Sequence, residues 1–306
     1  MKNIIFLIFP VLLFGCKNEE NPITNTAFGM TFNQYNQSIG DSLVSVNFSK
    51  KSYSNVAPVS GFEVFGGIYL STRSINKNMY IYKDFNSSSI IGLIDLSNLR
   101  TDYIAFNDTN TISVLALHVD EIDNMIYAIT TSYNSQTKNT WLGIVPISLE
   151  NKKVLPTINF MKATKEYLNS FLSEIDYKNK RIFIKASDNS ELIIYNYDKN
   201  NLQTKQMNAQ LMDLHYNSFR NCLFGTGHST NSFSLFEYSL TNNEIKSIGN
   251  YVGVDAVNIH GFYYDRANNT YWISGYLNGS KLLNINLTDA TIKDSFLSKK
   301  DIQYIN

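Results

Sequence analysis

Beyond residue 60, most of the chain alternates apolar and polar residues, which predicts β-strands with two unlike faces. Five segments repeat one layout: a strand, a turn, a second strand with a central aromatic residue, a polar turn and an alternating third strand. The second strands are Asn78–Tyr82, Met125–Ile129, Arg181–Ile184, Cys222–Gly225 and Thr270–Ile273. The third strands are Ile90–Leu96, Trp141–Leu149, Glu191–Tyr197, Phe233–Leu240 and Lys281–Leu287.

The segments recur every 41 to 56 residues or so, about the length of one four-stranded propeller blade. A period of two excludes helical solenoids, and a β-sandwich gives no reason for a repeated internal layout. We therefore predict an all-β fold, a β-propeller of five to six four-stranded blades, with six favoured. The run Ser42–Phe48 would belong to a sixth blade closed by the C-terminal Ile302–Ile305. Residues Lys162 to Leu172 are expected to form a short helical insert.

The first segment resembles one known class of propeller. Tyr80-Ile81-Tyr82-Lys83, followed by Ser89-Ile90-Ile91-Gly92-Leu93-Ile94-Asp95, is similar to the Tyr-Val-Thr-Asn (YVTN) repeat. The resemblance covers residues 66 to 298, and the later copies keep only its hydrophobic rhythm. It implies the propeller fold and no single activity, because such folds host many functions.

The N-terminus predicts export and lipid attachment. Met1-Lys2, the apolar run Ile4–Phe14 and Gly15-Cys16 form a signal peptide that is too short to span a bilayer. Leu13-Phe14-Gly15-Cys16 resembles the lipobox of bacterial lipoproteins, which implies acylation of Cys16 with fatty acids such as palmitate. The alternative is an ordinary signal peptide with a coincidental cysteine. We expect a signal peptide over residues 1–15, a lipidated tether over 16–26 and the propeller over 27–306.

The residues after Cys16 indicate which membrane the lipoprotein is attached to. Lys17 is not the aspartate that signals inner-membrane retention in well-studied lipoproteins. The acidic pair Glu19-Glu20 resembles the surface-export signal of lipoproteins in the Bacteroidetes group. We expect an outer-membrane lipoprotein of the bacterial cell envelope that faces the periplasm or the outside, with the outside favoured.

Composition narrows the list of partners. The 306 residues are 43 % hydrophobic and carry no formal net charge, so a large core is expected and nucleic acid is not. If Cys16 is acylated, Cys222 has no disulfide partner, and we expect it to be a packed strand residue. Trp141 and Trp272 lie in strand patterns, so we expect core positions rather than sugar-stacking platforms.

Two sets of polar residues recur at a fixed distance before the aromatic residue of the repeat. Asp120, Asp176, Asn217 and Asp265 lie seven residues before the aromatic residue, at the turn between the first two strands, and we expect them to bind backbone amides there. Nine residues before the same aromatic residue, the second to fifth segments carry His118, Glu174, His215 and Tyr263. Equivalent positions on the innermost strands form a ring around a propeller axis.

This ring predicts the candidate site. His118, Glu174 and His215 are a plausible set for a divalent metal with one open position, and Tyr263 and His260 would line the channel beside it. The alternative is that these residues line a wet channel or bond one another. No other cofactor is expected, because the sequence has no Gly-x-Ser-x-Gly, His-Glu-x-x-His, Walker or EF-hand motif.

Two functions therefore remain open. The first is a membrane-anchored binding or scaffold module for a protein or glycan ligand, because tyrosine and asparagine suit adaptable binding surfaces. The second is a metal-dependent hydrolase or lyase with its site in the channel. A third, a redox propeller that carries a quinone, rests on fold analogy alone.

Overall fold

The computed structural model describes most of the chain beyond residue 77 and parts of the chain before it. The described residues are 26–31, 42–58, 78–85, 88–95, 98, 100–106, 111–120, 122–163, 171–186, 190–229, 232–266, 268–297 and 302–303. Cys16 and the predicted signal peptide lie outside these ranges.

The described strands form six antiparallel sheets, here called blades I to VI. Blade I holds β24 (Ile302–Gln303), β1 (Thr26–Thr31), β2 (Ser42–Asn47) and β3 (Ser52–Pro58) in that order. Blade II holds β4 (Asn78–Phe85), β5 (Ser88–Asp95) and β6 (Thr101–Phe106). Blade III holds β7 (Thr111–Asp120), β8 (Met125–Asn134), β9 (Asn139–Ser148) and β10 (Lys153–Val154), with β11 (Ile158–Lys162) also paired to β9.

The other three blades have four strands each. Blade IV holds β12 (Phe171–Asp176), β13 (Arg181–Ala186), β14 (Glu191–Asn196) and β15 (Asn201–Gln206). Blade V holds β16 (His215–Asn217), β17 (Cys222–Ser229), β18 (Ser232–Ser239) and β19 (Ile245–Asn250). Blade VI holds β20 (Ala256–Asp265), β21 (Thr270–Tyr276), β22 (Ser280–Ile285) and β23 (Ile292–Leu297).

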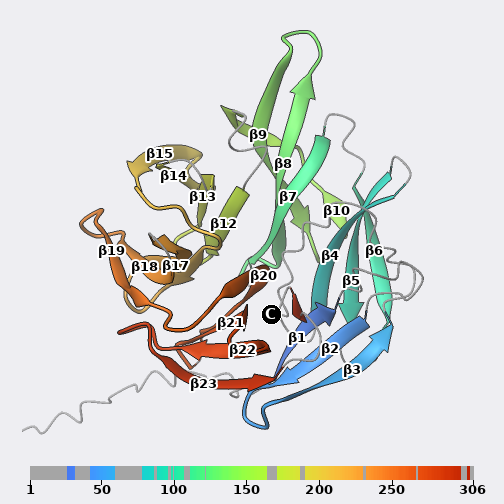
Figure 1. Cartoon of the computed structure of the whole chain (residues 1–306). Coiled ribbons are helices and arrows are strands. Elements are labelled where there is room, and N and C mark those ends of the chain that lie inside the picture. The colour runs from blue at the N-terminus through green and yellow to red at the C-terminus, as the bar shows by residue number, and fades with distance from the viewer. Residues whose placement is uncertain are drawn as a thin grey trace, which may run out of the picture.

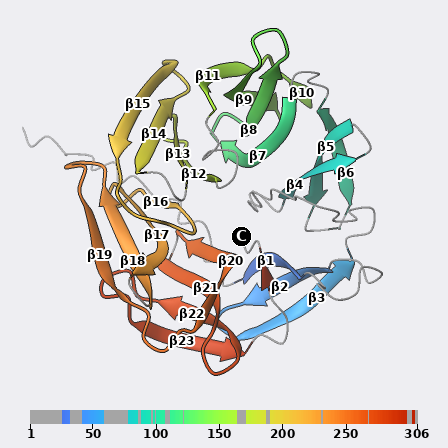
Figure 2. The same cartoon turned by 45° about the horizontal axis from the view of Figure 1, so that its top comes forward.

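The six blades stand in a ring around a central axis, which is the arrangement of a β-propeller (Figures 1 and 2). Five blades have at least four strands, and blade II has three described strands. The first strands β7, β12, β16 and β20 lie toward the centre in Figure 2. The ring closes where β24 pairs with β1, through Met30↔Gln303 and Thr31↔Ile302. The predicted fold class and the predicted closure of the Ser42–Phe48 blade by the C-terminal strand are confirmed.

The apolar core lies between neighbouring blades. Each of five described clusters joins two blades: II with III, III with IV, IV with V, V with VI, and VI with I. Between blades VI and I, for example, Phe48 stacks on Trp272 with ring centroids 4.5 Å apart. Trp272 is buried, as predicted. Blades III to VI therefore have both faces buried against neighbouring blades, and blades I and II each have at least one face buried in this way.

One local device shapes ten of the hairpin turns. An Asp, Asn or Ser at the end of a strand accepts a hydrogen bond from a backbone amide two or three residues later. The residue four positions after it has a positive φ, which asparagine tolerates better than most residues. These positive-φ residues are Lys51, Asn124, Lys138, Lys152, Lys180, Asn200, Asn221, Asn243, Asn269 and Ala290. The predicted turn role of Asp120, Asp176, Asn217 and Asp265 is confirmed.

Tyrosine reinforces four of these turns. Its hydroxyl donates to the side-chain oxygen of the positive-φ asparagine five residues later, so the ring packs in the blade while its polar end fixes the turn. The pairs are Tyr195–Asn200, Tyr216–Asn221, Tyr238–Asn243 and Tyr264–Asn269. A structural use thus accounts for part of the tyrosine and asparagine content.

The helical insert expected over Lys162 to Leu172 is wrong at both ends. Lys162 ends β11 and Phe171 begins β12, because both ends continue the strand pairing of their blades. Residues 164–170 lie outside the described ranges. In the described part of the chain, no helix is long and apolar enough to cross a membrane.

The buried carboxylate of Asp120 also joins blade III to blade IV, and this contact can be tested. Its Oδ2 accepts bonds from Tyr197 (2.7 Å) and Lys180 (2.9 Å), both on blade IV. Burial alone would raise the pKa of Asp120, but these two bonds outweigh it and hold the pKa below 3.8. Asp120 therefore stabilises the fold above its unfolded pKa, and this stabilisation is lost as the pH falls through the lower, folded pKa.

We expect Asp120→Asn to lower the free energy of unfolding at pH 7 by about 2 kcal/mol. The difference from wild type should begin to shrink below about pH 4, where the carboxyl protonates in the unfolded chain, and should vanish as the pH falls through the lower, folded pKa. Asp123→Asn is the control, because Asp123 also pairs with Lys180 (2.6 Å) but its side chain is 44 % exposed. Urea unfolding across pH measures both. Equal losses in the two variants would contradict the interpretation.

Candidate functional site

The four residues of the predicted ring occupy equivalent positions, as expected. Each lies opposite the aromatic residue of the second strand of its blade. The cross-strand pairs are His118↔Tyr127, Glu174↔Phe183, His215↔Phe224 and Tyr263↔Trp272. The sequence therefore predicted the register correctly.

The side chains at these positions point to the next blade rather than to a common centre. His118 Nε2 lies 2.8 Å from Ser173 Oγ on blade IV, and Glu174 Oε2 lies 3.8 Å from His215 Nδ1 on blade V. Tyr263 stacks on Phe48 of blade I, with ring centroids 5.2 Å apart. These residues thus link successive blades one contact at a time.

The predicted three-residue metal set is consequently not assembled. His118 contacts Ser173, and Glu174 and His215 approach one another. In the ranges that the structure describes, no three His, Cys, Asp or Glu side chains are grouped to hold a metal ion. Tyr263 packs in the interface between blades VI and I instead of lining a channel, and His260 belongs to β20 with its side chain outside the description.

Sequence reasoning missed Asp213, which the structure places beside His215. The segment before β16 lies along β17, where Met212 N donates to Thr226 O at 2.7 Å. Gly225 and Gly227 permit this approach, because a Cβ at either would lie 2.3 Å from a carbonyl oxygen of that segment. Thr226 N then donates to Asp213 Oδ1 at 2.6 Å. The Gly-Thr-Gly run was the available sequence signal.

Asp213 is the centre of a buried network between blades V and VI. Its Oδ2 accepts a bond from the Tyr271 hydroxyl, and Thr226 Oγ1 lies 2.9 Å from Tyr271 and 3.0 Å from Tyr251. Burial first, and then the Asp213 charge, hold the pKa of Tyr271 well above its usual value. His215 Nε2 lies 2.7 Å from Asp213 Oδ2, but not in hydrogen-bond geometry. The network fixes two blades together and keeps Tyr271 protonated.

Glu174 has a second partner across the ring. Arg266 on blade VI donates to Glu174 Oε1 at 3.0 Å, and its guanidinium lies 5.8 Å from the Tyr177 ring centroid. Glu174 is thus held between an arginine and a histidine from two other blades. Glu174 therefore joins three blades, and each of its carboxylate oxygens has a partner on another blade.

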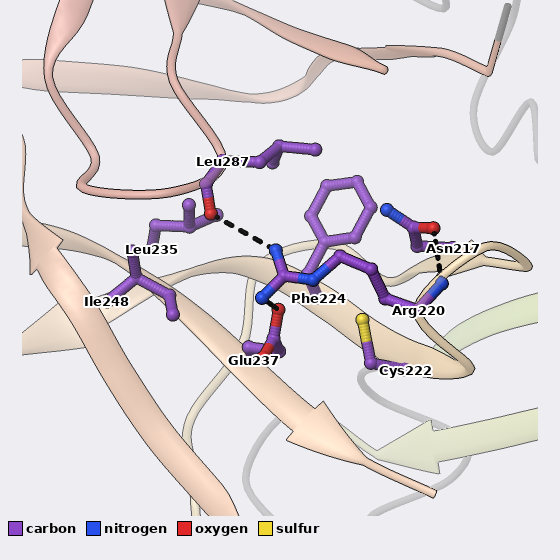
Figure 3. A pocket seen from close by; sticks show the side chains of 8 residues that line it. All are labelled: Asn217, Arg220, Cys222, Phe224, Leu235, Glu237, Ile248 and Leu287. Atoms are coloured by element: carbon purple, nitrogen blue, oxygen red, sulfur yellow. Dashed lines mark hydrogen bonds and ion pairs between the residues drawn. The ribbon is translucent and has the colours of Figure 1, made fainter.

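A narrow crevice at the outer part of blade V is occupied by protein (Figure 3). The Arg220 guanidinium lies across it and binds Glu237 Oε2 at 2.5 Å and Leu287 O at 3.4 Å. Cys222 lies beneath it, buried as predicted. Burial first, and then the charge of Glu237, raise the pKa of Cys222 to about 12, which leaves the thiol unreactive.

An open groove lies instead on the β8–β9 hairpin, which projects beyond the ring in Figure 1. Its volume is about 360 Å³, within the usual range of small-ligand sites. Ser132 and Trp141 face one another as a cross-strand pair, and β11 supplies Asn159, which accepts a bond from Ser132 Oγ at 3.2 Å. Tyr133, Asn134, Ser135 and Gln136 complete the lining.

The prediction of a core position for Trp141 is wrong. Trp141 is half-buried and lines this groove, whereas the sequence pattern predicted a core position. The reason is that Trp141 lies near the projecting end of the hairpin, and full burial on β9 begins only at Leu142. Tyr133 is 46 % exposed beside it. In the described part of the chain, neither ring has an aromatic partner, and the side chain of Gln136 has no hydrogen bond.

Comparison with known proteins supports the propeller fold. The sequence matches no family model and no curated protein, so the likeness to YVTN repeats stays a prediction. The structure is similar to TolB from Acinetobacter baumannii (TM-score 0.66, 8 % identity), over 92 % of this chain and 66 % of that chain. This chain thus spans just under two thirds of the TolB chain.

Two Bacteroides structures are similar over nearly their whole length. A protein of unknown function from Bacteroides caccae has a TM-score of 0.57 and 11 % identity, over 89 % of this chain and 94 % of that one. A candidate 6-phosphogluconolactonase from Bacteroides fragilis has a TM-score of 0.52 and 10 % identity, over 91 % and 97 %. At these identities the similarities establish the propeller fold alone.

The interblade geometry predicts the outcome of a metal test. We expect the Cys16→Ser chain to purify with substoichiometric metal by elemental analysis, and its Tm to be unchanged by chelator, because a ligand of the native state would stabilise it. Near-stoichiometric metal that is lost in His118→Ala and His215→Ala, and kept in the exposed control His228→Ala, would restore the metal-site hypothesis.

Proposed function

We propose that this protein is a lipid-anchored binding module whose propeller presents a glycan-binding groove on the β8–β9 hairpin. The observation that carries the proposal is the combination of the Trp141 ring with amide and hydroxyl groups in one open groove. The propeller supplies a rigid support, since blade III, which carries the hairpin, is packed on both faces. A protein ligand remains the other outcome of the test below.

The chemistry of the groove suits a neutral sugar. A sugar ring has an apolar C–H face that packs on an aromatic ring, and hydroxyls at its edge that require donors and acceptors. Trp141 supplies the ring, on the same face of the hairpin as Ser132, and Gln136 and Asn159 supply amides. Trp and Tyr lose little conformational freedom on binding, which favours them at recognition surfaces.

The anchor is the second part of the proposal. Acylation of Cys16 would tether the propeller to the outer membrane through the stretch up to Thr26. More than one acyl chain is needed for stable attachment. The outward-facing leaflet would place the groove where extracellular glycans occur. The propeller would then hold its ligand close to the cell surface.

We expect the Cys16→Ser chain to bind at least one neutral oligosaccharide on a glycan array, with the affinity measured by calorimetry. Trp141→Ala should weaken this binding by about tenfold, because a stacked aromatic contact is worth about 1 kcal/mol. Tyr133→Ala should weaken it less, because the Tyr133 side chain lies on the opposite face of the hairpin from Trp141.

Tyr103→Ala is the matched control, because Tyr103 is 49 % exposed but lies on β6, outside the groove. The control should bind as wild type does. Loss of affinity in Tyr103→Ala equal to that in Trp141→Ala, or no glycan binding at all, would overturn the assignment. A protein ligand that is sensitive to Trp141→Ala would keep the groove and replace the glycan.

Attachment is tested separately in cells. The wild-type chain should incorporate radiolabelled palmitate and sediment with the outer-membrane fraction, whereas Cys16→Ser should do neither. Cys222→Ser is the control and should be labelled as wild type is. Labelling that persists in Cys16→Ser would contradict the anchor without affecting the groove.

A further inference from the structure

A second groove, at the rim between blades IV and V, is lined by positive charge. Its volume is about 340 Å³. On β15, Asn201, Gln203 and Lys205 are two residues apart, so their side chains share one face of the strand. The turn between β18 and β19 supplies Thr241 and Asn243 from the neighbouring blade.

The charges of this groove are unbalanced. Arg181, Lys199 and Lys205 line it, and none of its described lining residues carries a carboxylate. Arg181 is already paired with Asp176 at 2.5 Å. Lys199 and Lys205 have no ion-pair partner in the described part of the chain, and the side-chain amides of Asn201 and Gln203 have no hydrogen bond there.

The floor of the groove is apolar. Ile194 lies opposite Gln203 in the sheet and is almost completely buried, and Leu240 approaches from blade V. The groove therefore combines an apolar floor, two free amides and two free ammonium groups. This combination fits a hydroxylated ring that carries an anionic group.

We propose that this groove binds an acidic saccharide. Lys199 and Lys205 would contact a carboxylate or sulfate group, Asn201 and Gln203 the ring hydroxyls, and Leu240 the C–H face of the ring. The proposal does not depend on the hairpin groove, which has different lining residues on blade III and no cation. Either site can fail in experiment without the other.

The test uses the Cys16→Ser chain and four probes: an oligogalacturonate, a sulfated oligosaccharide, a neutral oligosaccharide of equal length and inorganic sulfate. We expect at least one charged oligosaccharide to bind, and to bind more weakly at higher salt, because salt screens exposed charges. Lys199→Gln/Lys205→Gln should weaken that binding by about tenfold, since each exposed ion pair contributes modestly. Asn201→Ala/Gln203→Ala should also weaken it.

Lys153→Gln/Lys178→Gln is the matched control, because it removes two exposed lysines outside the groove. This variant should bind as wild type does, and thermal melts should show that all variants are folded. Equal loss in the control pair would attribute binding to overall charge and overturn the site. Inorganic sulfate that binds as tightly as the charged oligosaccharide would overturn the saccharide assignment. Failure of both charged probes to bind would overturn the proposal.

Discussion

Burial between blades is the constraint on which this structure depends. No described sheet has a core of its own, because each apolar cluster is shared by two blades. Such a ring is stable only when its first and last blades meet. The pairing of β1 with β24 provides this meeting by placing a strand from the end of the chain in the blade that begins it. Pairing also covers the inner edge of β1, which would otherwise be open to other chains.

The polar residues that most resemble a catalytic set also join neighbouring blades. His118, Glu174, His215 and Tyr263 each contact the following blade. The Asp213 network and the Glu174–Arg266 pair add polar contacts across the same interfaces. Buried polar contacts have directional geometry, so they fix how two blades sit together more narrowly than apolar packing does. The two proposed ligand sites lie elsewhere, at the rim and on the projecting hairpin.

Much of the fold could be predicted from local pattern. The alternation and the spacing of the five segments identify the strands, and the recurring Asp or Asn marks the turns, because these depend on nearby residues only. The side-chain directions could not be predicted, since the twist of each blade decides whether a position faces the axis or the neighbour. His118 and Glu174 kept the predicted register and still failed to converge. Asp213 was missed because it precedes its strand and reaches its place through a close backbone approach at Gly225.

The two grooves show a different limit of prediction from the sequence. The alternation of Asn201, Gln203 and Lys205 was visible in the sequence, but its meaning depended on a turn from the next blade. Trp141 fitted a core strand by pattern and is half-buried in a groove, because it lies near the projecting end of its hairpin, where full burial of β9 has ended. How far a hairpin projects from the blades around it is a tertiary property, which a single strand does not encode.

The hairpin turns have an evolutionary consequence. At each of them the backbone is held by a strand-terminal oxygen and a left-handed residue four positions on, so the intervening residues are not needed to hold the turn. Equivalent turns already differ freely there: the second position after the strand-terminal residue is Ile122 in blade III, Lys178 in blade IV and Phe219 in blade V, and all three are exposed. Mutations at these tips can alter surface chemistry without disturbing the ring. A lineage of such proteins can therefore change what it recognises while its architecture stays the same.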